Sequence, residues 1–101
     1  MIIDLFQKER EEGAVFLHPF DDRPLIAGYG SLGQEILQDV PDVDIVILCC
    51  GGGGLLAGTA TALAHLSSKP VRVFGVEPET ASGMFLSLQV NLLLTTTVLY
   101  H

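Results

Sequence analysis

The sequence predicts an α/β fold built on a parallel sheet. Two apolar segments of strand length, 43–50 and 71–76, flank a helical pattern at 55–67. A strand, a helix and a second strand in this order form a βαβ unit, whose two strands run parallel. The first segment is apolar from Ile45 to Cys50 without interruption. Such a run is typical of a strand that is buried on both faces of its sheet.

Further elements are expected on either side of this unit. Gly13 is a stop signal for an N-terminal helix, and Ser31 with Gln34 forms a capping box that predicts the start of another helix. The elements expected outside the unit are a helix at 2–12, a short strand at 14–17, a loop with two prolines at 18–24, a helix at 31–39 and a helix at 80–88.

The composition is that of one globular domain. The chain has 101 residues, of which 49% are hydrophobic and 17% charged, so it can bury a core and is not expected to be disordered. Its formal net charge of −7 argues against nucleic acid and anionic membrane surfaces as partners. Residues 80–101 contain no Lys, Arg, Asp or Glu, yet polar side chains interrupt them, so no membrane span is expected.

The two cysteines, Cys49 and Cys50, are adjacent at the end of the first apolar strand. Neighbouring residues of a strand point to opposite faces, so a disulfide between them is not expected, and their spacing fits no metal site. We interpret them as small buried hydrophobic residues of a protein in a reducing compartment, the cytoplasm. The N-terminal residues show no pattern of a secretory signal peptide.

The tetraglycine segment Gly51–Gly54 joins the first strand to the following helix. Glycine permits backbone conformations at positive φ and a close approach to a ligand. The first N–H groups of a helix have no intrahelical partner, and the helix dipole favours negative charge at this end. The segment is therefore predicted to bind an anion such as a phosphate group. The alternative, a flexible linker, conflicts with the hydrophobic strand and helix on its two sides.

Two stretches match the fingerprint of dinucleotide-binding folds. Gly28-Tyr-Gly-Ser-Leu-Gly33 matches it letter by letter but lacks a full strand before it, so a loop at the start of a helix is the favoured interpretation. The looser match at 52–57 has a strand before it, and an acid follows where a ribose-binding carboxylate is expected. The alternative is thus a Rossmann-like NAD-binding unit that uses Gly52, Gly54, Ala57 and Glu77.

Four segments occur in an order that points to a known family. They are Gly13-Ala-Val-Phe-Leu-His-Pro-Phe-Asp-Asp22, Ile26-Ala-Gly-Tyr-Gly-Ser-Leu-Gly-Gln-Glu35, Gly51-Gly-Gly-Gly-Leu-Leu-Ala-Gly58 and Val73-Phe-Gly-Val-Glu-Pro-Glu79. This combination resembles the fold-type II pyridoxal-phosphate enzymes, in particular the threonine/serine dehydratase and serine racemase branch with its tryptophan synthase beta-like domain. The resemblance implies a three-layer αβα domain, with residues 1–89 as a part of it and 90–101 as a divergent C-terminal tail.

The resemblance also implies a binding site. The cofactor would be pyridoxal 5'-phosphate, and backbone N–H groups of Gly51, Gly52, Gly53 and Gly54, together with that of Leu55, would bind its phosphate. The loop at 18–22 would lie near the entrance of the active site, where Phe20 would shape the pocket. A small amino-acid substrate and a homo-oligomer are implied as well.

Some members of that family bind Mg²⁺ or Ca²⁺ through a glutamate, a backbone carbonyl four residues on and an aspartate two residues further. Those positions are here Glu77, Ala81 and Gly83. Gly83 has no carboxylate, so the motif keeps Glu77 and the Ala81 carbonyl but loses one anionic ligand. This loss weakens the expectation of Mg²⁺, because a hard cation needs several oxygen ligands.

The chemistry of the family requires a Schiff-base lysine. The resemblance places that lysine upstream of the four segments, whereas this sequence contains only Lys8 and Lys69. At ~1.5 Å per residue, the helix after the glycines puts Lys69 roughly 20 Å from the phosphate site. We therefore interpret the chain as a fragment of an L-serine/L-threonine ammonia-lyase (dehydratase) or serine racemase that supplies cofactor binding, contains no catalytic residue and is inactive alone. A non-catalytic interaction fragment is the remaining alternative.

Overall fold

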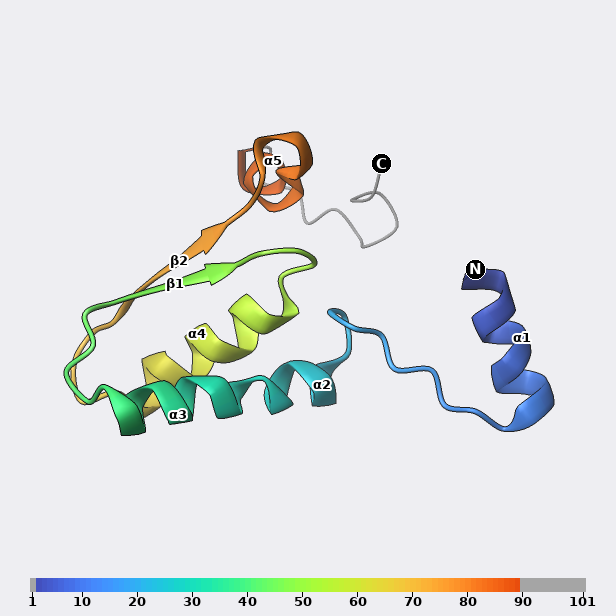
Figure 1. Cartoon of the computed structure of the whole chain (residues 1–101), viewed down its shortest axis with the longest axis horizontal. Helices are drawn as coiled ribbons and strands as arrows, with labels where there is room; N and C mark the ends of the chain where they lie inside the picture. The colour runs from blue at the N-terminus through green and yellow to red at the C-terminus, as the bar shows by residue number, and fades with distance from the viewer. Residues whose placement is uncertain (1, 90–101) are drawn as a thin grey trace.

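The computed structural model describes residues 2–89, so the expectation of a divergent tail at 90–101 lies outside the described residues. Helices and strands alternate in the second half of this range (Figure 1). The elements in chain order are α1 (Ile2–Glu12), α2 (Arg23–Gly28), α3 (Gly30–Asp39), β1 (Ile45–Cys49), α4 (Gly54–Leu66), β2 (Arg72–Val76), the short 3₁₀ helix η1 (Glu79–Ala81) and α5 (Gly83–Gln89).

Strands β1 and β2 form a two-stranded parallel sheet, which confirms the predicted βαβ unit. Their register runs from Ile45 opposite Arg72 to Cys49 opposite Val76. Helices α3 and α4 pack against each other on one side of this sheet (Figure 1). Gly75 of β2 allows α4 to come close, because a Cβ at this position would lie 2.7 Å from Cδ2 of Leu56.

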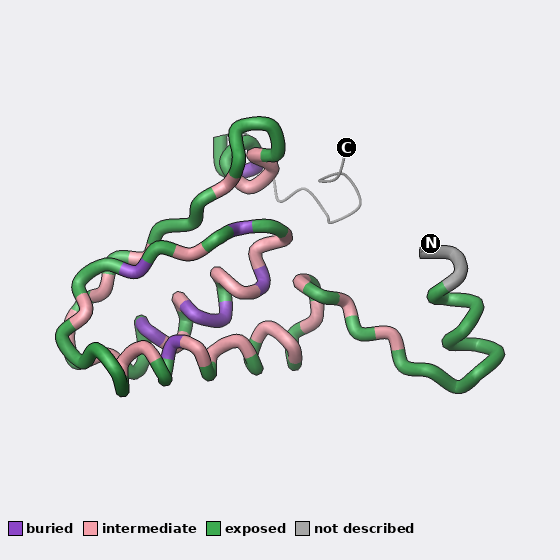
Figure 2. Tube along the Cα trace, in the orientation of Figure 1, coloured by how far each residue is buried: buried purple, intermediate pink, exposed green. Residues whose placement is uncertain are grey.

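The buried centre of the molecule follows α4 (Figure 2). Leu63 and Thr59 of this helix have no exposed surface, and Val46 of β1 is 8% exposed. Gly33 brings the backbone of α3 into contact with α4, since a Cβ there would lie 2.8 Å from Cβ of Ala62 and 2.9 Å from the Thr59 carbonyl oxygen. A larger residue at position 33 would therefore separate the two helices.

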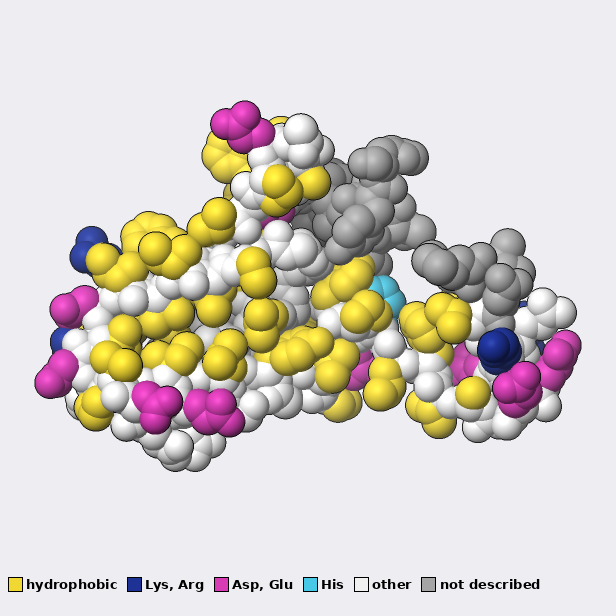
Figure 3. All heavy atoms as spheres, in the orientation of Figure 1, with side chains coloured by type: hydrophobic (Ala, Val, Ile, Leu, Met, Phe, Trp, Pro, Cys, Tyr) yellow, Lys and Arg dark blue, Asp and Glu magenta, His cyan; other side chains and the backbone are white. Residues whose placement is uncertain are grey.

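The opposite face of the sheet is uncovered in the described part of the chain. Its apolar residues Ile45, Ile47, Phe74 and Val76 are 44%, 66%, 50% and 53% exposed. Figure 3 shows hydrophobic side chains reaching the surface over the sheet and the helices beneath it. The expectation that β1 is buried on both faces is therefore wrong for residues 2–89, where helices cover only one face.

Two local expectations upstream of α3 are wrong. Residues 14–17 are irregular, because no described strand pairs with them and an unpaired segment gains no ladder hydrogen bonds. The loop expected at 18–24 ends at Asp22, whose carboxylate accepts the Leu25 N–H at 3.4 Å and caps α2. Pro24 fits in the first turn of α2, where its missing N–H has no intrahelical partner to lose.

The predicted capping box at Ser31 is also wrong. Helix α3 begins at Gly30 with Tyr29 as its N-cap, and the Tyr29 side chain makes no capping hydrogen bond. Tyr29 keeps helical backbone angles, and its N–H donates to the Leu25 carbonyl at 3.1 Å. The chain thus passes from α2 to α3 with hardly an interruption, so Ser31 lies inside a helical segment.

At the other end of the chain, the helix predicted at 80–88 divides into η1 and α5. No helix among residues 2–89 combines the length and the apolar character that a membrane crossing requires.

Candidate functional site

The tetraglycine segment connects the carboxyl end of β1 to the first turn of α4. Gly53 is the N-cap of α4 and has φ of +90°, a left-handed conformation that side chains other than glycine adopt at a cost of roughly 1–2 kcal/mol. No side chain of the described residues caps this end. The first backbone N–H groups of the helix are therefore left for an external acceptor, and the helix dipole favours an anion there.

The turn at 19–21 packs directly on this loop. A Cβ on Gly52 would lie 2.5 Å from Cδ1 of Phe20 and closer still to Cγ and Cδ2 of the same ring. A Cβ on Gly54 would lie 2.9 Å from Cα of Phe20. Two of the four glycines thus face Phe20 at distances that permit no side chain, which gives these positions a packing reason to be glycine.

The loop and the turn enclose a small hollow of about 180 Å³. Its walls come from the four glycines, from the start of α4 and from the turn, and Tyr29 closes one side. The Tyr29 hydroxyl donates to the Pro19 carbonyl at 2.9 Å and so links helix α2 and the turn. The hollow is lined by backbone amides, by the aromatic residues Phe20 and Tyr29 and by Cys49, and it has no charged side chain. This set of groups can position an anionic group.

The two cysteines differ in their surroundings. Cys50 is 6% exposed, and burial raises the pKa of its thiol, with the Glu77 carboxylate and Cys49 adding to the effect. Cys49 is exposed and borders the hollow at the glycine loop, so the expectation that both cysteines are buried is wrong. The thiol next to the glycine loop therefore stays neutral, and it adds no negative charge beside a bound anion.

Glu77 follows β2, and both of its carboxylate oxygens are engaged. Oε1 accepts the Met84 N–H at 2.9 Å, and Oε2 accepts the Phe85 N–H at 2.9 Å. These donors belong to the first turn of α5, so Glu77 acts as a cap for that helix. Residues 2–89 contain no group of three acidic, histidine or cysteine side chains suited to a metal ion. The side chains present do not fit a Mg²⁺ site.

Lys69 lies at the end of β1 that is opposite to the glycine loop. Lys69 donates to the Asp42 carbonyl at 2.7 Å and to Asp44 Oδ1 at 2.9 Å. Asp44 precedes β1, whereas the glycines follow it, so this ion pair lies at the opposite end of the strand. Lys8 belongs to α1.

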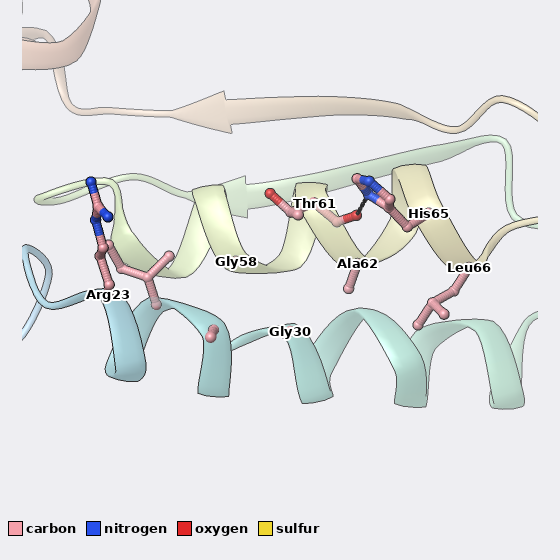
Figure 4. A pocket seen from close by; sticks show the side chains of 9 residues that line it. Arg23, Gly30, Gly58, Thr61, Ala62, His65 and Leu66 are labelled. Atoms are coloured by element: carbon pink, nitrogen blue, oxygen red, sulfur yellow. Dashed lines mark hydrogen bonds between the residues drawn. The ribbon is translucent and has the colours of Figure 1, made fainter.

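A larger hollow of about 520 Å³ lies between α4 and the helices α2 and α3 (Figure 4). Its walls are mostly apolar, with Ala62 and Leu66 on α4 and Ile26 on α2. Figure 4 shows the His65 ring bonded to the Thr61 carbonyl, at 2.9 Å from Nδ1, within its own helix. Of the polar residues in its lining, Thr61 and His65 form hydrogen bonds within α4, so the glycine loop remains the candidate site.

The glycine loop, its helix and the sheet have counterparts in known proteins. The sequence profile of the family described as "Pyridoxal-phosphate dependent enzyme" matches residues 4–97. The chain belongs to this family. The Glu77 carboxylate, which the NAD-binding alternative would need for a ribose, accepts two N–H groups of α5 in this structure.

Among curated relatives, the L-threonine ammonia-lyase of Geobacter sulfurreducens is 47% identical over 83 residues, which are 82% of this chain and 20% of that protein. The L-threonine dehydratase catabolic TdcB of Escherichia coli K12 is 48% identical over 73 residues, covering 72% of this chain and 22% of that protein. The chain thus spans about a fifth of the length of these relatives.

Solved structures show the same fold. The processed form of threonine deaminase isoform 2 from Solanum lycopersicum superposes with a TM-score of 0.79 at 35% identity, over 88% of this chain and 26% of that one. Serine racemase from Dictyostelium discoideum superposes with a TM-score of 0.80 at 31% identity, over 96% of this chain and 32% of that one. This part of the chain therefore has the architecture of the fold-type II enzymes, as the sequence predicted.

Sequence reasoning located the glycine loop but missed what holds it. The contact of Phe20 with Gly52 joins segments far apart in the chain, and the role of His18 in shaping the turn was not predicted. The only sequence signal was the motif His18-Pro-Phe20 itself, which the family resemblance placed near the active-site entrance.

Proposed function

We propose that this chain supplies the phosphate-binding loop of a pyridoxal 5'-phosphate enzyme that acts as an L-serine/L-threonine ammonia-lyase or a serine racemase. The backbone N–H groups of Gly51–Gly54 and of Leu55 bind the cofactor phosphate. The observation that carries the proposal is the conformation of this loop, in which Gly53 has φ of +90° at a helix N-terminus that no described side chain caps.

The residues present fit a phosphate better than a larger charged group. The hollow beside the loop has a volume of about 180 Å³, and the nearby Cys50 thiol is kept neutral by the burial that raises its pKa. Backbone amides at a helix N-terminus bind phosphate without a cationic side chain. The small size of the hollow and its neutral lining support an occupant that presents one phosphate group.

The chemistry of the bound cofactor is to withdraw electrons from the substrate amino acid. The part of this chain is to hold the phosphate and so to fix the position of the cofactor. We infer that neither Lys69, which is held by Asp44 at the far end of β1, nor Lys8 of α1 bonds the cofactor. We infer an amino-acid substrate from the names of the relatives, and a homo-oligomeric enzyme from the family resemblance alone. A cytoplasmic location agrees with two free cysteines.

The proposal contains no divalent cation. Glu77 uses both carboxylate oxygens to cap α5, and Gly83 offers no carboxylate at the position of the third ligand. We assign Glu77 the structural role of joining the end of β2 to α5. The carbonyl of Ala81 alone is too weak a site for a hard cation.

The test is a titration of the ¹⁵N-labelled chain with pyridoxine 5'-phosphate, followed by amide chemical shifts. This compound lacks the aldehyde that would react with Lys8 or Lys69, and pyridoxine without phosphate is the matched control ligand. Saturable shifts centred on Gly51–Leu55 with the phosphate ester alone support the proposal. Equal shifts with pyridoxine, or shifts elsewhere, contradict it.

A pair of variants sharpens the experiment. Gly53→Ala places a side chain at φ of +90° and should weaken binding of the phosphate ester by roughly tenfold, as ~1–2 kcal/mol of backbone strain implies. Gly28→Ala is the control, because a Cβ there meets nothing within 4 Å. Equal affinities of the two variants would argue against the loop as the phosphate site.

A further inference from the structure

The imidazole of His18 organises the turn that covers the glycine loop. Its Nδ1 accepts the backbone N–H of Asp21 at 3.0 Å and that of Phe20 at 3.4 Å. A ring nitrogen that accepts hydrogen bonds carries no proton, so the neutral ring holds its proton on Nε2. One side chain thus satisfies two consecutive amides of the turn.

The same ring also packs on Phe20. The centroids of the His18 and Phe20 rings lie 4.5 Å apart in an edge-to-face arrangement with an interplanar angle of 83°. On its other side, His18 meets Phe16 edge-on at 6.0 Å. The backbone and the side chain of Phe20 are therefore both held by His18, one through a hydrogen bond and the other through ring contact.

Phe20 is in turn the residue that lies against the loop. Its ring occupies the space where Gly52 would carry a side chain, and its backbone lies where Gly54 would carry one. A displacement of the turn would remove one wall of the hollow at the glycines. The path from His18 to the loop contains a single intervening residue, and each step is a direct contact.

We propose that His18 is a positioning residue for the phosphate loop, and that it acts through Nδ1 by fixing the turn that carries Phe20. The proposal rests on the phosphate-binding function of the loop and adds the residue that sets its shape. His18 packs against the rings of Phe20 and Phe16, and its effect on the loop passes through Phe20, so we assign it a positioning role and not a catalytic one.

The test compares two substitutions of similar polarity. His18→Asn keeps an acceptor at the position of Nδ1, since Oδ1 of asparagine is separated from Cα by the same number of bonds. His18→Gln moves the acceptor one bond further out, to the position of Nε2. A role as a mere surface or packing residue predicts equal effects, whereas a role of Nδ1 predicts that asparagine rescues and glutamine does not.

The first readout uses the free protein. In His18→Gln, the amide signals of Gly52 and Gly54 should shift, and hydrogen exchange at the Phe20 and Asp21 amides should accelerate about tenfold, the factor that a lost hydrogen bond of ~1.4 kcal/mol gives. His18→Asn loses the same ring contacts but keeps the acceptor, so both effects should be clearly smaller in it than in His18→Gln. Equal behaviour of the two variants, or glycine amides that do not respond, overturns the proposal.

The second readout concerns the histidine and the ligand. A long-range ¹H–¹⁵N spectrum should show Nδ1 of His18 without a proton; a proton on Nδ1 overturns the proposal. Pyridoxine 5'-phosphate should bind about fivefold more weakly to His18→Gln than to His18→Asn, as loss of a hydrogen bond of ~1 kcal/mol implies. Wild-type protein that fails to bind this ligand refutes the phosphate site, while the free-protein comparison still decides the role of His18.

Discussion

The contact between Phe20 and Gly52 can be measured by a double-mutant cycle. An alanine at position 52 places its Cβ inside the ring of Phe20, with all three nearest atoms, Cγ, Cδ1 and Cδ2, belonging to that side chain. Extra atoms in a packed contact destabilise a protein by about 1–3 kcal/mol. Phe20→Ala deletes the three atoms, so Gly52→Ala should cost this amount in the wild-type background and close to nothing in Phe20→Ala.

The coupling free energy between the two substitutions should therefore be about 1–3 kcal/mol. In a domain of this size, each kcal/mol corresponds to roughly 4–8 °C in the melting temperature. Urea denaturation followed by circular dichroism gives the four free energies of unfolding that the cycle requires. A sum that is additive within about 0.5 kcal/mol would refute the packing of Phe20 on the loop.

Gly54 supplies the matched control for this cycle. A Cβ there would lie 2.9 Å from Cα and 3.0 Å from the carbonyl oxygen of Phe20, two atoms that Phe20→Ala keeps. Gly54→Ala should therefore cost the same in both backgrounds. Rescue of Gly54→Ala by Phe20→Ala would show that the turn moves as a whole, and the coupling at Gly52 could then not be assigned to the ring.

Three further predictions concern charged and ionisable groups. The hydrogen bond and charge of Lys69 lower the pKa of Asp44 below 3.8, so Lys69→Gln should raise that pKa in an NMR titration; the stabilisation is present above the unfolded-state pKa and is lost as the pH falls through the lower folded value. Iodoacetamide should alkylate the exposed Cys49 before Cys50, whose pKa is raised by burial. Peptide mass spectrometry would measure the order, and preferential reaction of Cys50 would contradict its burial next to the glycine loop. Glu77→Gln should cost about 1–3 kcal/mol of stability through loss of a charged cap, and Mg²⁺ should leave the melting temperature of the wild type unchanged; a saturable upward shift with Mg²⁺ would restore the metal site.

Elements with strong local patterns were predictable from the sequence. The strands around Ile47 and Phe74 and the helix after the glycines follow from apolar runs and periodicity. Pro24 considered alone indicates a loop, whereas the structure places it in the first turn of α2, a position that suits proline. The strand expected at 14–17 does not form, because β-propensity alone forms no strand without a partner strand.

Contacts between segments that are far apart in the chain are the part of the site that could not be predicted from the sequence. The glycine run indicates an anion-binding turn because strand, loop and helix are consecutive in the chain. The spacing of residues in the sequence does not show that Phe20 contacts Gly52. It also does not show that the Glu77 carboxylate accepts hydrogen bonds from the amides of Met84 and Phe85. The family resemblance offered Glu77 as a metal ligand, and only its hydrogen bonds indicate the capping role.

The uncovered face of the sheet and the glycine loop differ in what they need from the rest of the fold. Ile47 and Phe74 are 66% and 50% exposed. The apolar pattern predicted burial on both faces of the sheet, but residues 2–89 cover only one of them. A sheet face needs a second layer of helices from elsewhere in the fold. A phosphate site needs only the amides of one strand-to-helix turn, and a single segment can specify it. Side chains that act on a substrate must converge from several segments, so this βαβ unit can carry the phosphate anchor of its family without carrying the chemistry.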